Sequence, residues 1–65
     1  MSNKIERNGF EREVTKSDGS SYTTRSNTKG DNEGHAEHES KYSDVDHVTT
    51  YNDGKASRTY HNPNK

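Results

Sequence analysis

The chain of 65 residues contains no cysteine, no leucine and no tryptophan, and it has a single proline. The absence of cysteine excludes a disulfide framework and a thiolate metal site. Hydrophobic residues make up only 18% of the sequence, and no apolar run approaches the ~18 residues of a membrane span. The first residues also lack the apolar stretch of a signal peptide. We therefore expect no membrane contact and a cytoplasmic location.

The scarcity of apolar side chains limits how stable an isolated copy can be. Folding must offset the conformational entropy of every ordered residue, and hydrophobic burial is the main source of that free energy. We expect no conventional hydrophobic core here. The chain is expected either to order by pairing with a partner or with itself, or to remain substantially disordered as an isolated monomer.

The net charge of −1 conceals three blocks. Residues 1–30 carry a net charge of +2, residues 31–46 carry −5, and residues 47–65 carry +2. A nucleic-acid-binding domain usually has an isoelectric point above ~9, whereas the value here is 6.4. We therefore expect no nucleic-acid partner. Catalysis needs groups held on a rigid, partly dry scaffold, so we also expect no enzyme.

Turn dipeptides divide the chain into strand-like runs. Turns are predicted at residues 8–9, 18–19 and 53–54, where Asn-Gly or Asp-Gly occurs between segments rich in Thr, Tyr and Val. The first turn would place Ile5 opposite Arg12. The second would place Val14 opposite Tyr22, on a face shared with Phe10. The third would pair Tyr51 with Ala56 and His47 with Tyr60, which puts Val48 on the opposite face from Val45.

These signals predict an all-β fold if the chain is ordered, as a thin meander of β-hairpins. We expect N-terminal hairpins over 1–28, a disordered acidic loop or linker with histidines over 29–44, a C-terminal hairpin over 45–61, and a frayed tail over 62–65. No amphipathic helix longer than one turn is expected, because apolar residues never recur at helical spacing. The resemblance between the hairpins at 18–19 and 53–54 is compatible with a duplication or with shared strand composition.

Two sets of side chains are candidate functional residues. Exposed strand edges lined by Thr and Tyr invite pairing with another chain, and aromatic side chains are good contact residues. The interaction candidates are Tyr22, Tyr51, Tyr60, Val14 and Phe10. Imidazole and carboxylate groups together bind divalent metals such as zinc or nickel. The metal candidates are His35, His38, His47, Asp44 and Asp46, although their spacing matches no established metal motif and solvated histidines need no ligand.

Three functions remain open. The sequence favours a small non-enzymatic accessory or interaction protein that orders by β-pairing with an unidentified partner or with itself. The high glycine content and a mean hydropathy of −1.72 resemble the hydrophilins, a compositional class that implies a solvating role in the stress response. The third possibility is a divalent-metal binder that uses the histidines and carboxylates.

Overall fold

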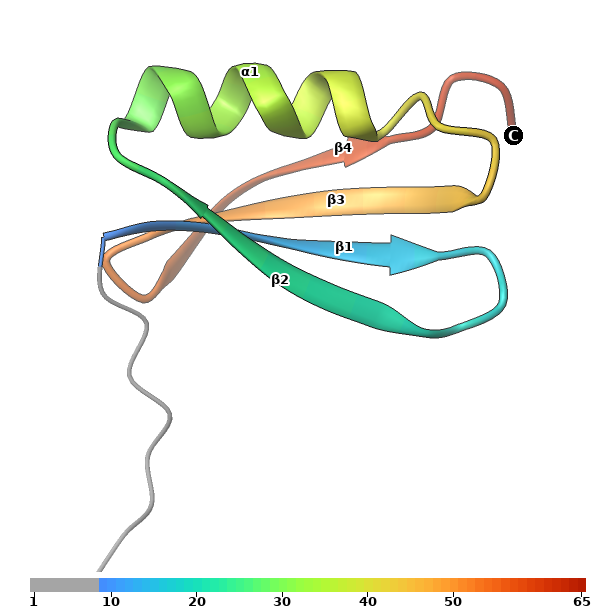
Figure 1. Cartoon of the computed structure of the whole chain (residues 1–65), viewed down its shortest axis with the longest axis horizontal. Coiled ribbons are helices and arrows are strands. Elements are labelled where there is room, and N and C mark those ends of the chain that lie inside the picture. The colour runs from blue at the N-terminus through green and yellow to red at the C-terminus, as the bar shows by residue number, and fades with distance from the viewer. Residues whose placement is uncertain (1–8) are drawn as a thin grey trace, which may run out of the picture.

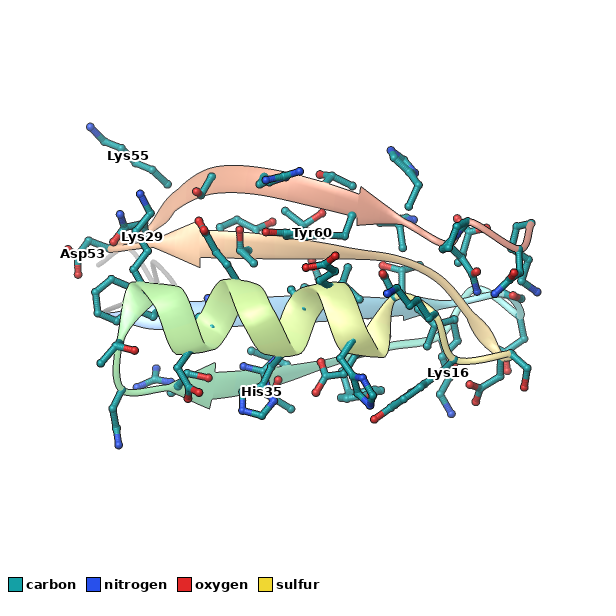
Figure 2. The ribbon with its side chains drawn as sticks, turned by 90° about the horizontal axis from the view of Figure 1, so that it is seen from above. Lys16, Lys29, His35, Asp53, Lys55 and Tyr60 are labelled. Carbon is teal, nitrogen blue, oxygen red and sulfur yellow. The ribbon has the colours of Figure 1, made fainter. Side chains whose placement is uncertain are left out.

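A computed structural model describes residues 9–65 and contains four strands and one helix (Figure 1). The elements are β1 (Phe10–Lys16), β2 (Ser21–Ser26), α1 (Lys29–Glu39), β3 (Val45–Asn52) and β4 (Lys55–His61). The strands form one antiparallel sheet in the order β2-β1-β3-β4. The predicted mostly-β fold built from hairpins is therefore confirmed. The helix lies across one face of this sheet, over the central strands (Figure 2).

The hairpin between β1 and β2 has the predicted register. Val14 lies opposite Tyr22, and the turn places Gly19 at a φ of 93°, a conformation that favours glycine. The Oδ1 atom of Asp18 accepts hydrogen bonds from the backbone N–H and the hydroxyl of Ser20, at 2.9 and 2.6 Å. The Asp-Gly pair therefore closes this turn through both backbone conformation and side-chain hydrogen bonding.

Irregularities in β3 and β4 make part of the predicted C-terminal register wrong. Tyr51 does lie opposite Ala56, but Tyr60 lies opposite Val48 instead of His47. The register of the β3–β4 pair shifts between Thr50 and Tyr51. The register of the β1–β3 pair shifts between Thr15 and Lys16. Because a bulge breaks the alternation of a strand, Val45 and Val48 both reach the face that the helix covers.

The prediction of a disordered connector over 29–44 is wrong, because α1 occupies most of it. Thr28 caps the helix, and its Oγ1 accepts a hydrogen bond from the backbone N–H of Asp31. The buried positions of α1 are Asn32 and Ala36, one turn apart, and Ser40 follows one turn later at the helix end. Since two of these three residues are polar, a search for apolar side chains at helical spacing could not find the helix.

The buried apolar core is small. Val14, Val45 and Val48 from the sheet and Ala36 from the helix form it, and Tyr60 packs against its edge. All four side chains of this apolar core are aliphatic and short, so the layer between helix and sheet is thin. The expectation that this chain builds no large apolar core agrees with this arrangement.

The predicted frayed tail is also corrected in part, because Asn62 is buried. Its Nδ2 donates to the carbonyl oxygens of Tyr42 and Val45, both at 2.8 Å, and its backbone N–H donates to Asp46. These bonds attach the end of β4 to the loop between α1 and β3. Buried carbonyl groups need such partners, which explains why the segment is ordered here.

The predicted turn at 8–9 and the placement of Ile5 opposite Arg12 fall largely outside the described residues. Within them, Arg12 has a backbone partner in each neighbouring strand, Thr24 in β2 and Thr50 in β3. Across residues 9–65, no helix has the length and apolar character that a membrane span requires.

Candidate interaction site

A buried polar network joins the helix to the sheet. Arg12, only 5% exposed, makes a two-pronged ion pair with Glu39, with Nε to Oε1 at 2.9 Å and Nη2 to Oε2 at 3.2 Å. Its Nη1 donates to the hydroxyl of Ser26 and to Oδ1 of Asn32. The amide of Asn32 in turn donates to the backbone carbonyl of Glu11. Because these charges are paired and hydrogen-bonded inside the fold, they support the sheet and do not face a ligand.

Within residues 9–65, the two outer strands have backbone groups that face no neighbouring strand. Adjacent residues of an antiparallel strand direct their N–H and C=O groups to opposite sides. The N–H of Asn62 donates to Asp46, so alternation turns the groups of Thr59 and His61 away from β3. On the other edge, the bond from Lys16 to Ser20 implies that the groups of Thr23 point away from β1. Both edges are therefore candidates for strand addition.

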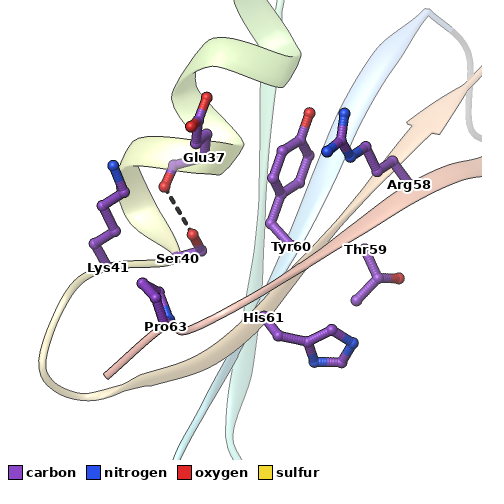
Figure 3. A pocket seen from close by; sticks show the side chains of 8 residues that line it. All are labelled: Glu37, Ser40, Lys41, Arg58, Thr59, Tyr60, His61 and Pro63. Carbon is purple, nitrogen blue, oxygen red and sulfur yellow. Dashed lines mark hydrogen bonds between the residues drawn. The ribbon is translucent and has the colours of Figure 1, made fainter. Parts of the chain in front are cut away.

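A groove runs beside the β4 edge (Figure 3). The groove is open, encloses about 340 Å³, and lies between β4 and the end of α1. Its lining combines charged, hydroxyl and aromatic side chains, and a proline follows the strand. The lining residues are Glu37, Ser40, Lys41, Arg58, Thr59, Tyr60, His61 and Pro63.

Two cations of the groove have no ionic partner in the described part of the chain. The guanidinium carbon of Arg58 lies 4.6 Å from the centre of the Tyr60 ring, and Figure 3 shows the two side chains next to each other. The observed salt bridges of residues 9–65 involve neither Arg58 nor Lys41. The carboxylate of Glu37 also lines the groove. The cation–π contact holds the Arg58 guanidinium in place while leaving it able to bind an anion.

The structure does not gather the metal candidates. His35 and His38 lie on α1, where the Nε2 atom of His35 is 3.4 Å from Asp31 and the ring of His38 packs edge-on against Tyr42. His47 lies on β3 beside Asp46, with 2.9 Å between Nδ1 and Oδ2, and its ring centre is 5.8 Å from that of His61.

The last metal candidate, Asp44, is bonded elsewhere, and its Oδ2 lies 3.2 Å from the Nζ of Lys16. Within residues 9–65, no group of three or more histidine, aspartate or glutamate side chains is arranged to hold a metal ion. The divalent-metal function therefore gains no geometric support from this part of the chain.

The interaction candidates are spread over different surfaces. Tyr60 lines the groove, whereas Tyr22 is 40% exposed on the β2 edge and Tyr51 is half-buried in β3. Val14 is 0% exposed and belongs to the core, and Phe10 is half-buried at the start of β1. The sequence thus pointed to one residue of the groove.

Arg58 and Lys41 were not found from the sequence. Arg58 lies on β4 and Lys41 lies in the turn that follows α1, and only the packing of α1 on the sheet brings them to one groove (Figure 3). The alternation of Arg58 and Tyr60 along one strand was the single readable signal.

The resolved pKa shifts lie outside the groove, in and beside the β1–β2 turn on the opposite side of the sheet from β4. The hydrogen bond and charge of Asp44 raise the pKa of Lys16 above its usual 10.5. The hydrogen bonds from the hydroxyl and the backbone N–H of Ser20 lower the pKa of Asp18 below its usual 3.8. Both groups are exposed, so these shifts mark a well-formed turn and do not point to a catalytic centre.

Comparisons with protein-family models, with curated proteins and with solved structures found no match.

Proposed function

We propose that this protein is a small non-enzymatic interaction module that binds an extended segment of a partner protein as an additional strand on β4. The observation that carries the proposal is the open β4 edge with a groove beside it. An extended peptide that joins a sheet gains main-chain hydrogen bonds, and adjacent pockets for alternate side chains give selectivity. The β4 edge combines both features.

The composition of β4 supports a binding strand. Every residue of the strand except Tyr60 is exposed, and its sequence Lys-Ala-Ser-Arg-Thr-Tyr-His contains no proline. Proteins often protect an edge strand with charged side chains, so Lys55 and Arg58 would restrict pairing to partners that tolerate or complement them. The side chains of such a strand would discriminate between partners, while its backbone would form the main-chain hydrogen bonds with any partner that binds.

Pairing between two copies through β4 is the competing form of the same function. It would bring the cationic side chains of the two β4 strands together, because β4 contains no aspartate or glutamate. The other edge strand, β2, contains none either. Like charges facing each other across strands are destabilising. We therefore favour a different partner chain over self-association.

A peptide display experiment tests the proposal. The full chain is immobilised, random peptides are selected on it, and the affinities of the selected peptides are measured for the wild type and two proline variants. Thr59→Pro removes an N–H that points away from β3, so the sheet tolerates it while an added strand loses a hydrogen bond. Thr23→Pro makes the matching change on the β2 edge.

We expect Thr59→Pro to abolish peptide binding and Thr23→Pro to preserve it, with circular dichroism showing that both variants keep the fold. Enrichment of no peptide above the uncoated support would contradict the proposal. Equal binding by the wild type and a folded Thr59→Pro variant would contradict it as well.

A further inference from the structure

The charges of β4 itself are unbalanced, although the carboxylate of Glu33 on α1 lies beside the strand, where it accepts a hydrogen bond from the hydroxyl of Ser57 at 3.4 Å. Along the strand, Lys55 and Arg58 are cationic and no residue is acidic. Across the groove, Lys41 adds a second cation to that of Arg58, and Glu37 supplies the single carboxylate of the lining. By contrast, Arg25 on β2 is bonded to Glu11, with Nη2 to Oε2 at 2.6 Å. Among the strands of residues 9–65, the cations of β4 are thus the ones without a carboxylate partner.

The contact with the Tyr60 ring also fixes the orientation of the Arg58 guanidinium. Arg58 and Tyr60 are two residues apart in β4, so both side chains project from the same face, and Figure 3 shows them side by side. Thr59 and His61 project from the opposite face (Figure 3). An added strand would alternate in the same way, so every second side chain of the partner would face Arg58 and the groove.

We infer that the partner segment carries carboxylates at alternate positions, one of them received by Arg58 and the next directed toward Lys41. This inference rests on the proposed strand addition at β4. A guanidinium matches a carboxylate with two parallel hydrogen bonds, and Arg58 is held ready by the Tyr60 ring. The partner is therefore an acidic extended peptide with a period of two.

The chain's own edge strands do not fit this description. Neither β2 nor β4 has an acidic residue, and β1, which carries Glu11 and Glu13 at alternate positions, is flanked on both sides by β2 and β3. The other acidic pairs with this spacing, Asp31 with Glu33, Glu37 with Glu39 and Asp44 with Asp46, lie in α1 or at the entry to β3, so a second copy would have to break its helix or its sheet to offer them as a strand. The inference therefore points to a different protein.

The probe is the acetylated and amidated peptide Thr-Val-Glu-Val-Glu-Val-Thr, compared with versions in which both glutamates are glutamine or lysine. Binding to the full chain is measured by fluorescence anisotropy, and the site is mapped by NMR amide shifts. An exposed ion pair changes affinity by about twofold to fivefold. We expect the glutamate peptide to bind about fourfold to twenty-fivefold more tightly than the glutamine peptide, with the lysine peptide weakest. Added salt should narrow this gap.

Charge variants of the protein assign the effect to the groove. Arg58→Gln should weaken binding of the glutamate peptide by about twofold to fivefold, and Glu37→Gln should strengthen it by a similar factor. Lys29→Gln is the matched control, because Lys29 is an exposed cation at the far end of α1 and should leave the affinity unchanged.

The outcomes separate the inference from the proposed function. Equal affinity for the glutamate and glutamine peptides, with binding still abolished by Thr59→Pro, would overturn the carboxylate preference and leave strand addition standing. Binding of the glutamate peptide that survives Thr59→Pro would overturn both. If neutral peptides selected by display bind at β4 while the glutamate peptide does not, the inference is wrong.

Discussion

Arg12 is the residue whose replacement most directly probes what holds this sheet and helix together. Arg12→Met removes the ion pair with Glu39 and leaves that carboxylate, 15% exposed, without its cation. Removing one partner of a buried ion pair costs about 3–5 kcal/mol. A domain of this length is stable by roughly 3–10 kcal/mol at 0.05–0.15 kcal/mol per residue. The substitution should therefore remove much of the stability of the protein.

Urea unfolding followed by circular dichroism measures the loss, and the melting temperature should fall by more than about 12 °C. The double variant Arg12→Met with Glu39→Met is the control, because it removes both charges and replaces them with apolar side chains. It should regain about 2 kcal/mol relative to the single variant, since no unpaired carboxylate remains. An Arg12→Met variant within about 0.5 kcal/mol of the wild type would refute the structural role of the network.

Two further predictions concern local contacts. Asn62→Ala should lower the free energy of unfolding by about 1–3 kcal/mol, because two carbonyl groups lose their donor. Urea unfolding measures this loss, with Asn64→Ala as the control. Equal stability of the two variants would contradict the prediction. The pKa of Asp18 is lowered in the folded state, so the ionised carboxylate stabilises the fold above its ordinary pKa of 3.8 and this contribution disappears as the pH falls below that value. Asp18→Asn should therefore lower the urea midpoint near pH 7 more than at about pH 2, and an equal difference at both pH values would argue against the assignment.

The parts of the fold that could be predicted from the sequence are those set by local chemistry. Asp18-Gly19 predicts the first described turn and its register because few residues other than glycine adopt a φ of 93°. Thr28 and Asp31 also match the spacing of a helix start, Ser or Thr followed three residues later by an acid. This capping motif is the feature of the sequence that indicates α1, and apolar periodicity does not detect it.

The remaining features depend on contacts between distant residues. The buried face of α1 is recognisable only once Arg12 is known to lie beneath it, since Asn32 and Glu39 look like solvent-exposed residues in the sequence. The irregularity in the β1–β3 pairing that brings Val45 and Val48 to one face carries no turn signal. The groove likewise depends on the packing of the helix end against β4, so the sequence identified Tyr60 but not Lys41.

Amide hydrogen exchange at β4 tests the central claim, which is that this strand is an open edge that binds an extended partner. In the isolated protein, the amides of Tyr60 and Asn62 should be protected by β3, while those of Thr59 and His61 should exchange rapidly. Addition of the glutamate peptide should slow exchange at Thr59 and His61. Protection of these two amides in dilute protein without peptide, or unchanged exchange when the peptide is bound, would contradict the account.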